Sequence, residues 1–256
     1  TSPWATKVGS YLIETFMNTR NYDAALQSIN KINHPDAALM EAKQKLLCRA
    51  GQESFAGGDM ERAVSLLSEA IGMGNYDRET RAEALFWRGE AHYRQGNISG
   101  ARTDYASSLS QKGAGRMALL ARYGLAYCYY RQGNWNEAYK QFDRFFSTSG
   151  VATQTDNATR ADVWGRMGDC LFQTRRYADA IAAYDKALSI DPESSDYAVY
   201  QKCDEAEKTA NCQKTVKAMR QMGFDLLLNA HRIIRRDSDS IVIAGMENWG
   251  TLKRMP

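Results

Sequence analysis

The sequence has few of the residues that metal sites and disulfide frameworks need. Among its 256 residues there are five cysteines and three histidines. The cysteines include no CxxC pair and no other metal-ligand spacing, which excludes the common zinc motifs. An odd, scattered set of this kind indicates free thiols and leans weakly towards a reducing compartment.

Long apolar runs and an excess of one charge are absent as well. No run approaches the roughly 18 apolar residues that a membrane-spanning helix requires, so we expect no membrane insertion. The formal net charge is +3, and residues 1–200 carry 23 basic and 23 acidic side chains. The excess lies in residues 201–256, with 10 basic against 7 acidic side chains. This balance provides no basic surface for nucleic acid, and we expect no nucleic-acid partner.

Catalytic and nucleotide-binding motifs are missing too. The chain has no phosphate-binding P-loop, no Gly-x-Ser-x-Gly elbow and no dinucleotide fingerprint. His92, Cys128 and Cys170 occupy packing positions in the pattern described next, which favours a core role over ligation. We therefore predict a non-enzymatic protein with no catalytic residue, no metal site and no cofactor.

The chain does contain a repeated helical pattern, which is clearest between Ala161 and Pro192. With Ala161 as position 1, apolar residues stand at positions 4, 7 and 11 of a first helix and at 17, 24 and 28 of a second. Small residues, Gly168 and Ala180, stand at positions 8 and 20, where the two helices cross. Pro192 ends the second helix because proline lacks an amide donor. Neither helix can bury its apolar face alone, so the pattern predicts further copies.

Those copies follow one another at separations of 38, 38, 37 and 42 residues, read from position 20. Positions 8 and 24 recur at the same separations. The markers are Ala25, Ala63, Ala101, Ala138 and Ala180 at position 20, Ile13, Gly51, Gly89, Ala126 and Gly168 at position 8, and Ile29, Leu67, Tyr105, Phe142 and Tyr184 at position 24. The widest separation contains residues 147–159, which read as a polar loop.

These positions resemble the tetratricopeptide repeat, whose usual period is about 34 residues. The resemblance implies an all-α fold, a right-handed superhelix (solenoid) of helix pairs over residues 1–195. It places repeats near 6–33, 44–71, 82–109, 119–146 and 161–192. Several residues depart from the family pattern, among them Gly9 at position 4 of the first repeat. Arg20 replaces the usual glycine at position 15, and Arg88 replaces an apolar residue at position 7, which predicts a slightly rotated first helix in the third repeat.

After Pro192 the helical period is lost. Residues 196–222 fit a degenerate repeat or a capping helix, and residues 223–256 form an atypical segment. Alternating apolar residues on either side of Asp237–Ser240 predict a strand hairpin. The last part of the chain, from near Tyr200, resembles a fragment of a calcineurin-like metallophosphoesterase without the metal motifs of those enzymes. We transfer the hairpin shape from this resemblance and not the activity.

In tetratricopeptide repeats, positions 2, 5, 9 and 12 of the first helices face the concave side of the superhelix. The groove expected here is lined by aromatic and charged side chains. They are Phe86, Glu90, Tyr93 and Arg94 in the third repeat, Tyr123, Tyr127, Tyr130 and Arg131 in the fourth, and Asp162, Asp169 and Phe172 in the fifth. Tyrosine suits a binding surface because it offers a broad ring with a polar tip at low entropic cost. The alternative is that these tyrosines pack against neighbouring helices.

The resemblance therefore implies a scaffold that binds a protein or peptide partner in the concave groove. Two other roles remain open, an architectural segment of a longer solenoid and a remnant or fusion of a metallophosphoesterase. The period near 38 and the stretch from Ala82 to Asn97 are similar to long repeat proteins of Bacteroidetes, often associated with the cell envelope. That similarity favours a bacterial source and the envelope or periplasm, and the unpaired cysteines favour the cytoplasm as the alternative.

Overall fold

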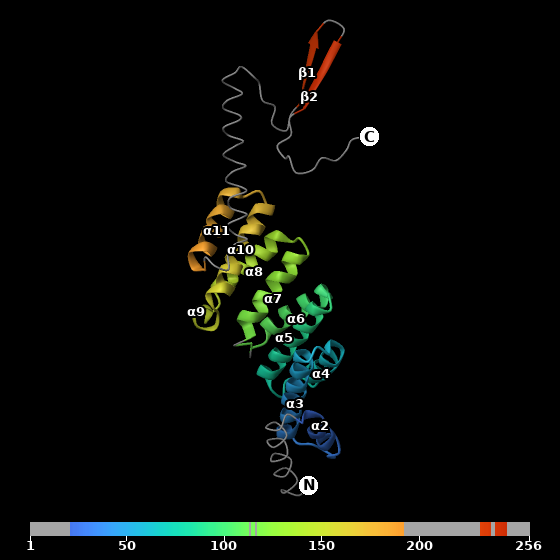
Figure 1. The fold of residues 1–256 in the computed structure, drawn as a ribbon. Coiled ribbons are helices and arrows are strands. Elements are labelled where there is room, and N and C mark those ends of the chain that lie inside the picture. The colour runs from blue at the N-terminus through green and yellow to red at the C-terminus, as the bar shows by residue number, and fades with distance from the viewer. Residues whose placement is uncertain (1–20, 113, 116, 192–230, 237–238, 245–256) are drawn as a thin grey trace. The chain divides into compact units, whose positions relative to one another are not determined.

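The computed structural model describes residues 21–112, 114–115, 117–191, 231–236 and 239–244. The chain divides into two units, Thr1–Ala198 and Val199–Pro256. Helix pairs build the described part of the first unit, and the described part of the second unit is a strand hairpin (Figure 1).

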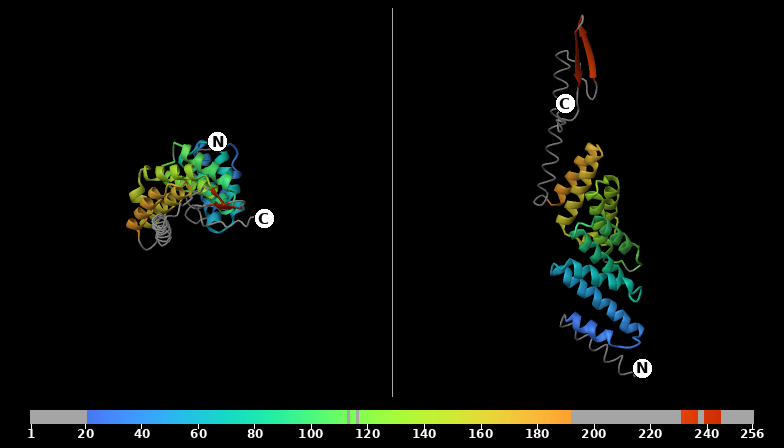
Figure 2. Two further views of the ribbon diagram at one scale, coloured as in Figure 1. Left: turned by 90° about the horizontal axis from the view of Figure 1, so that it is seen from above. Right: turned by 90° about the vertical axis from the view of Figure 1, so that its right-hand side faces the viewer.

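In the first unit, the two helices of each repeat alternate along the chain. The first helices are α3 (Ala37–Ala56), α5 (Arg78–Arg94), α7 (Met117–Arg131) and α10 (Asn157–Gln173). The second helices are α2 (Tyr22–Asn30), α4 (Met60–Gly72), α6 (Ile98–Ser110), α8 (Trp135–Phe146) and α11 (Tyr177–Ile190). Each of these first helices packs against the second helix that follows it, and α2, α4, α6 and α8 also pack against the next first helix. The pairs form one continuous stack (Figure 2), as predicted for a solenoid.

The core of the stack lies at the predicted marker positions. The alanines of position 20 are at most 1% exposed in all five repeats. Glycine at position 8 allows the large side chain of position 24 to approach. A Cβ atom on Gly51 would lie 2.6 Å from Cγ of Leu67, and one on Gly89 would lie 2.9 Å from Cε1 of Tyr105. The small residues therefore do what the sequence predicted, because a larger side chain would overlap the second helix.

The turn between the two helices of a repeat uses two adjacent positions. Position 15 is left-handed, with φ of 86° at Gly58, 80° at Gly96 and 69° at Gly133, a conformation that glycine adopts without a Cβ clash. The next residue caps the second helix by accepting a hydrogen bond from a backbone N–H three residues later. These capping residues are Asp59, Asn97 and Asn134.

The fifth repeat departs from this turn. Arg175 stands at position 15 and adopts a φ of 62°, which is unfavourable for a residue with a Cβ. Arg176 stands at the capping position and makes no side-chain cap hydrogen bond. Helix α11 therefore begins with less local support than the other second helices.

Arg88, for which a slightly rotated α5 was expected, has a buried partner on α6. Its Nη2 and Nε atoms donate to the two carboxylate oxygens of Asp104 on α6, at 2.6 and 2.8 Å. Asp104 is 3% exposed, and Nδ1 of His92 lies 3.1 Å from the same carboxylate. A buried carboxylate thus gives the guanidinium a partner at a position where other repeats carry an apolar side chain. Gly89 keeps the close approach to position 24, and the expected rotation of α5 stays a prediction.

The prediction of a polar loop at 147–159 is wrong in part, because the segment contains helical residues. Helix α9 (Val151–Gln154) forms a single turn, and α10 already begins at Asn157. The side chain of Asp156 accepts a hydrogen bond from the Thr159 backbone N–H at 2.7 Å and caps α10.

Three thiols lie inside the stack, as predicted for Cys128 and Cys170. These two and Cys48 are free and at most 1% exposed. Burial raises the pKa of each thiol to about 12, so all three are protonated at neutral pH.

The described residues of the second unit form the predicted hairpin. Strands β1 (His231–Arg236) and β2 (Asp239–Ala244) pair antiparallel, with His231 opposite Ala244 and Arg236 opposite Asp239. Residues 196–222, where a degenerate repeat or capping helix was expected, lie outside the described residues. The resemblance of this part of the chain to metallophosphoesterases stays a prediction.

Candidate partner-binding face

Position 12 of each described first helix is aromatic, which places one ring per repeat along the stack. We call these four residues the aromatic row, and they are Phe55 on α3, Tyr93 on α5, Tyr130 on α7 and Phe172 on α10. Helix α3 packs against α5, and α5 packs against α7, so the rings of these repeats stand on adjacent helices. Phe55 is buried, and the other three rings are partly exposed.

In two repeats the residue after the ring is an arginine that stacks on the ring of the preceding repeat. Cζ of Arg94 lies 4.1 Å from the ring centroid of Phe55, and Cζ of Arg131 lies 5.3 Å from that of Tyr93. Cation–π contacts of this kind hold the face of the guanidinium against the ring. Both arginines are exposed, and neither forms an ion pair within the part of the chain that the structure describes.

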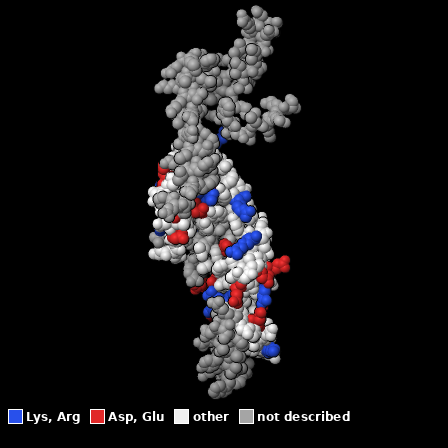
Figure 3. Space-filling view, in the orientation of Figure 1, with Lys and Arg blue, Asp and Glu red and all other residues white. Residues whose placement is uncertain are grey.

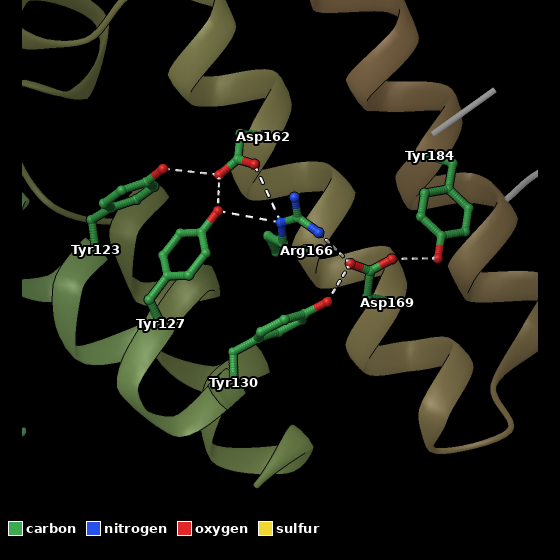
Figure 4. Close-up of polar contacts among 7 residues, drawn as sticks. All are labelled: Tyr123, Tyr127, Tyr130, Asp162, Arg166, Asp169 and Tyr184. Carbon is green, nitrogen blue, oxygen red and sulfur yellow. Dashed lines mark hydrogen bonds and ion pairs between the residues drawn. The ribbon is translucent and has the colours of Figure 1, made fainter. Parts of the chain in front are cut away.

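The junction between α7 and α10 is built differently from the earlier ones. The backbones of these two helices approach each other less closely than those of α3 and α5 or of α5 and α7. Tyrosine side chains of α7 and charged side chains of α10 span the distance (Figure 4). Long polar side chains thus replace direct helix contact on this side of the junction.

Asp162 on α10 accepts hydrogen bonds from two of these tyrosines. The hydroxyl of Tyr123 donates to Oδ2 of Asp162 at 2.9 Å, and the hydroxyl of Tyr127 donates to the same oxygen. Nε of Arg166 donates to the Tyr127 hydroxyl oxygen at 3.2 Å and to Oδ1 of Asp162 at 3.3 Å. One carboxylate therefore joins two donors of the fourth repeat to one of the fifth.

Asp169, two helical turns further along α10, is the second acceptor. Tyr130 donates to its Oδ2 at 2.7 Å, and Tyr184 of α11 donates to its Oδ1 at 2.9 Å. Nη1 of Arg166 donates to Oδ2 at 3.0 Å and so connects the two carboxylates. Asp169 is 6% exposed, and a buried carboxylate needs this full set of donors.

The network has a fixed protonation state near neutral pH. Burial, together with the nearby carboxylates, raises the pKa of Tyr123, Tyr127 and Tyr130, so all three hydroxyls remain donors. Burial alone would lower the pKa of Arg166, but the contacts with Tyr127 and the two carboxylates raise it overall. The arginine therefore stays charged between the two acids.

A related contact occurs within the third repeat. The hydroxyl of Tyr105, at position 24, donates to Oε1 of Glu90, at position 9, at 2.6 Å. Burial raises the pKa of Glu90, and the contacts with Tyr105 and Arg94 partly offset that rise. Tyr184 and Asp169 repeat this pairing in the fifth repeat.

The structure separates the predicted groove residues by exposure. Phe86 is 5% exposed and Asp169 6% exposed, so both serve the core, because side chains with so little free area do not reach a partner. The partly exposed residues whose polar atoms bond inside the array are Glu90, Tyr123, Tyr127, Tyr130 and Asp162. The residues that offer free surface are Tyr93, Arg94, Arg131 and Phe172.

Sequence reasoning missed Arg166 and Tyr184 as members of this network. A signal for Arg166 was present, because Asp162, Arg166 and Asp169 are spaced four and three residues apart and share one face of a helix. Tyr184 was assigned only to the core, and its hydroxyl gave no signal of a carboxylate partner at position 9.

The charged surface shows no large area of one sign on the side in view. In Figure 3 the basic and acidic side chains of the described residues are interspersed with uncharged ones. Within the described residues, no cluster of histidine, cysteine and carboxylate groups could hold a metal ion. None of the described helices has the length and apolar character to cross a membrane.

Three family models of the tetratricopeptide repeat match the chain. They cover residues 48–116, 120–148 and 161–194, which together make up more than half of its 256 residues. The chain belongs to the tetratricopeptide repeat family. Tetratricopeptide repeats are typically non-enzymatic scaffolds for protein–protein interaction, and the stack of helix pairs is the framework of such a scaffold.

Solved tetratricopeptide repeat structures have a similar fold. The MamA protein matches with a TM-score of 0.52 and 15% identity, over 75% of this chain and 94% of MamA. YrrB, a tetratricopeptide repeat protein with an unusual peptide-binding site, matches with a TM-score of 0.54 and 16% identity, over 74% of this chain and 88% of YrrB. MamA of Desulfovibrio magneticus RS-1 matches with a TM-score of 0.50 and 19% identity, over 70% of this chain and 96% of that protein. No curated protein matches.

Proposed function

We propose that this protein is a scaffold that captures a peptide segment of a partner protein along the inner face of its first helices. The observation that carries the proposal is the aromatic row. One ring stands at the same position of each described first helix, and Tyr93, Tyr130 and Phe172 keep part of their surface exposed. A segment that lies across the first helices meets a new ring on each helix.

The hydrogen bonds of the α7 tyrosines favour binding because they hold these side chains in place. Tyr130 is bonded to the buried carboxylate of Asp169, and Tyr123 and Tyr127 are bonded to Asp162. Side chains that are already ordered lose little entropy when a partner binds. Packing between helices and partner binding therefore do not exclude each other. The hydroxyl of each tyrosine serves the contact with the neighbouring helix, and its ring serves the partner.

The fold comparison is consistent with peptide capture. YrrB, with a TM-score of 0.54 to this chain, is a tetratricopeptide repeat protein with a peptide-binding site. Because the identity is 16%, the position of a site in YrrB says nothing about its position here, and our proposal rests on the aromatic row.

The test is photocrosslinking from single positions. The photoreactive amino acid p-benzoylphenylalanine is incorporated at the position of Tyr93, inside the aromatic row, or at the position of Tyr76. Tyr76 is 43% exposed but lies in the turn between α4 and α5. After irradiation in a lysate of the source organism, we expect a discrete adduct from position 93 and none of the same mass from position 76.

The outcomes separate capture on the inner face from an architectural role. An adduct from position 93 alone supports the proposal, and mass spectrometry then identifies the crosslinked segment. Equal adducts from both positions, or none from either, would favour an architectural segment of a longer solenoid, in which the ends of the array are the sites of contact.

A further inference from the structure

We infer that the partner segment is acidic and that Arg94 and Arg131 bind two of its carboxylates. This inference rests on the proposed capture of a peptide on the inner face and adds the chemistry of that peptide. It starts from a contrast between two kinds of arginine on the first helices.

Three arginines of the first helices already have a carboxylate partner. Arg88 is bonded to the buried carboxylate of Asp104, and Arg166 lies between Asp162 and Asp169. Towards the start of the stack, the exposed side chain of Arg49 is also paired, since its Nη1 lies 3.7 Å from Oε1 of Glu83. Each of these cations has a carboxylate within its own or the neighbouring repeat.

Arg94 and Arg131 have no such partner within the described residues, although both are exposed. Glu90 lies one turn before Arg94 on α5 and attracts it electrostatically, but no close ion pair forms, and its carboxylate accepts a hydrogen bond from the Tyr105 hydroxyl of α6 at 2.6 Å. Two exposed guanidiniums without a close ion pair, on adjacent first helices, make this stretch of the inner face complementary to negative charge.

Their stacking on the rings adds geometric selectivity. A guanidinium held over an aromatic ring still has N–H donors along the edges that the ring does not engage. Those edges match the two oxygens of a carboxylate, which accepts two parallel hydrogen bonds. The rings of Phe55 and Tyr93 therefore hold the two arginines ready for bidentate contacts.

The spacing of the two helices predicts the spacing of the acids. Packed helices lie about 8–10 Å apart, and an extended chain rises about 3.3 Å per residue. A segment that crosses α5 and α7 therefore advances about three residues from one arginine to the other. We expect two acidic residues about three positions apart, with an apolar or aromatic residue nearby for Tyr93.

The basic stretch is confined to the middle of the stack. The residues at the same position as Arg94 and Arg131 are Ala56 in the second repeat and Gln173 in the fifth, and neither is charged. The acidic part of the segment is therefore short, and the flanking repeats contact its neutral residues.

The experiment is selection from a random dodecapeptide library displayed on phage, using the full chain as bait. Parallel selections use the variants R94A/R131A and R102A/K186A. The second variant is a matched control, because Arg102 and Lys186 also stack on rings, those of Tyr129 and Trp164, but stand on second helices. Circular dichroism first establishes that all three proteins are folded.

We expect the wild-type chain and the control to enrich acidic peptides with paired carboxylates, and R94A/R131A to lose that preference. Fluorescence anisotropy with one enriched peptide should then show binding about tenfold weaker for R94A/R131A and unchanged for R102A/K186A, as two partly exposed charge contacts predict. The difference should shrink as salt is raised.

The remaining outcomes overturn the inference in distinguishable ways. Enriched peptides that are neutral or basic would contradict an acidic partner and leave peptide capture standing. Acidic peptides whose affinity falls equally in both double variants would show a nonspecific charge effect. Failure of the wild-type chain to enrich any peptide would overturn both this inference and the proposed function.

Discussion

Gly165 and Gly168 lie three residues apart on α10, yet they meet different surroundings. A Cβ on Gly168 would overlap the ring of Tyr184, whereas a Cβ on Gly165 would meet nothing within 4 Å. Tyr184 is 1% exposed and its hydroxyl is bonded to Asp169, so the ring cannot move aside. One helix therefore contains a glycine required by packing and another that packing does not require.

We predict that Gly168→Ala lowers the free energy of unfolding by about 1–3 kcal/mol, because it overpacks the contact with Tyr184. Gly165→Ala is the control and should raise it by up to about 1 kcal/mol, because alanine is the better helix former. Urea denaturation followed by circular dichroism measures both. Equal effects of the two changes would contradict this account of position 8.

A second residue-scale prediction concerns Arg175, which has a φ of 62° in the turn before α11. Arg175→Gly should raise the free energy of unfolding by about 0.5–1 kcal/mol, since the relief of left-handed strain exceeds the entropy that glycine adds to the unfolded chain. Thermal unfolding provides the measurement. Gly133→Ala, at a φ of 69° in the preceding repeat, should shift the midpoint in the opposite direction.

At the scale of helices, the hydroxyl contacts between α7 and α10 should have a measurable effect on stability. Tyr130→Phe removes one donor from Asp169, and we expect a loss of about 1 kcal/mol in the free energy of unfolding. Tyr129→Phe, one residue earlier, removes a hydroxyl that bonds to no described residue and should change stability by less than about 0.5 kcal/mol. If the two variants unfold at the same denaturant concentration, the network contributes nothing to the junction.

The pairing of α5 with α6 predicts a pH dependence. Burial raises the pKa of Glu90, so the ionised carboxylate is less favourable in the folded chain than in the unfolded one. Its contribution to stability is therefore full below the unfolded pKa and is lost as the pH rises through the folded pKa. Glu90→Gln should stabilise the protein at pH 7, and that gain should shrink as the pH falls through the raised folded pKa and be absent below the unfolded pKa of about 4.5.

Denaturation midpoints of the wild type and Glu90→Gln, measured from pH 3.5 to 8, test this sign. Glu53→Gln is the control, because Glu53 is exposed on α3. A Glu90→Gln gain that stays constant over this range would show that Glu90 does not titrate differently in the folded chain.

For the whole molecule, the buried thiols report on the integrity of the stack. Cys48, Cys128 and Cys170 belong to three different repeats, and burial raises the pKa of each to about 12. In a variant with serine at positions 203 and 212, we expect a thiol reagent at pH 8 to leave these three unmodified until urea unfolds the chain. Modification of one thiol well below the unfolding transition would instead reveal separate opening of its repeat.

The sequence was sufficient to predict the stack because its markers act locally. Gly89 and Tyr105, or Ala180 and its crossing helix, belong to one repeat, and their sizes alone indicate the contact. The candidate site was predicted less completely. Tyr123, Tyr127 and Tyr130 were identified as groove residues. That their hydroxyls would bond to α10 while part of each ring stays exposed depends on the distance between α7 and α10, which the repeat pattern does not give.

Other contacts were missed for the same reason, namely that repeat positions do not specify distances between helices. Nothing in the sequence indicated the buried acid that pairs with Arg88, because Asp104 belongs to the second helix and follows no family pattern. The start of α10 depends on the cap formed by Asp156, which was not separated from the polar residues around it. Partners that arise from tertiary distance, rather than from repeat position, were not predictable.

The unequal sides of the junction between the fourth and fifth repeats have a mechanical consequence. On one side α8 and α10 pack directly, and the cluster there includes Phe142, Phe145, Val163 and Met167. On the other side, hydroxyl–carboxylate bonds join α7 to α10, and water can replace such bonds more readily than it can replace apolar contacts. We expect a change in curvature at this junction to rotate the helices about the apolar side and to separate α7 from α10 on the polar side. We expect a bulky guest to open the polar side first, because the apolar contacts between α8 and α10 are the harder ones to separate.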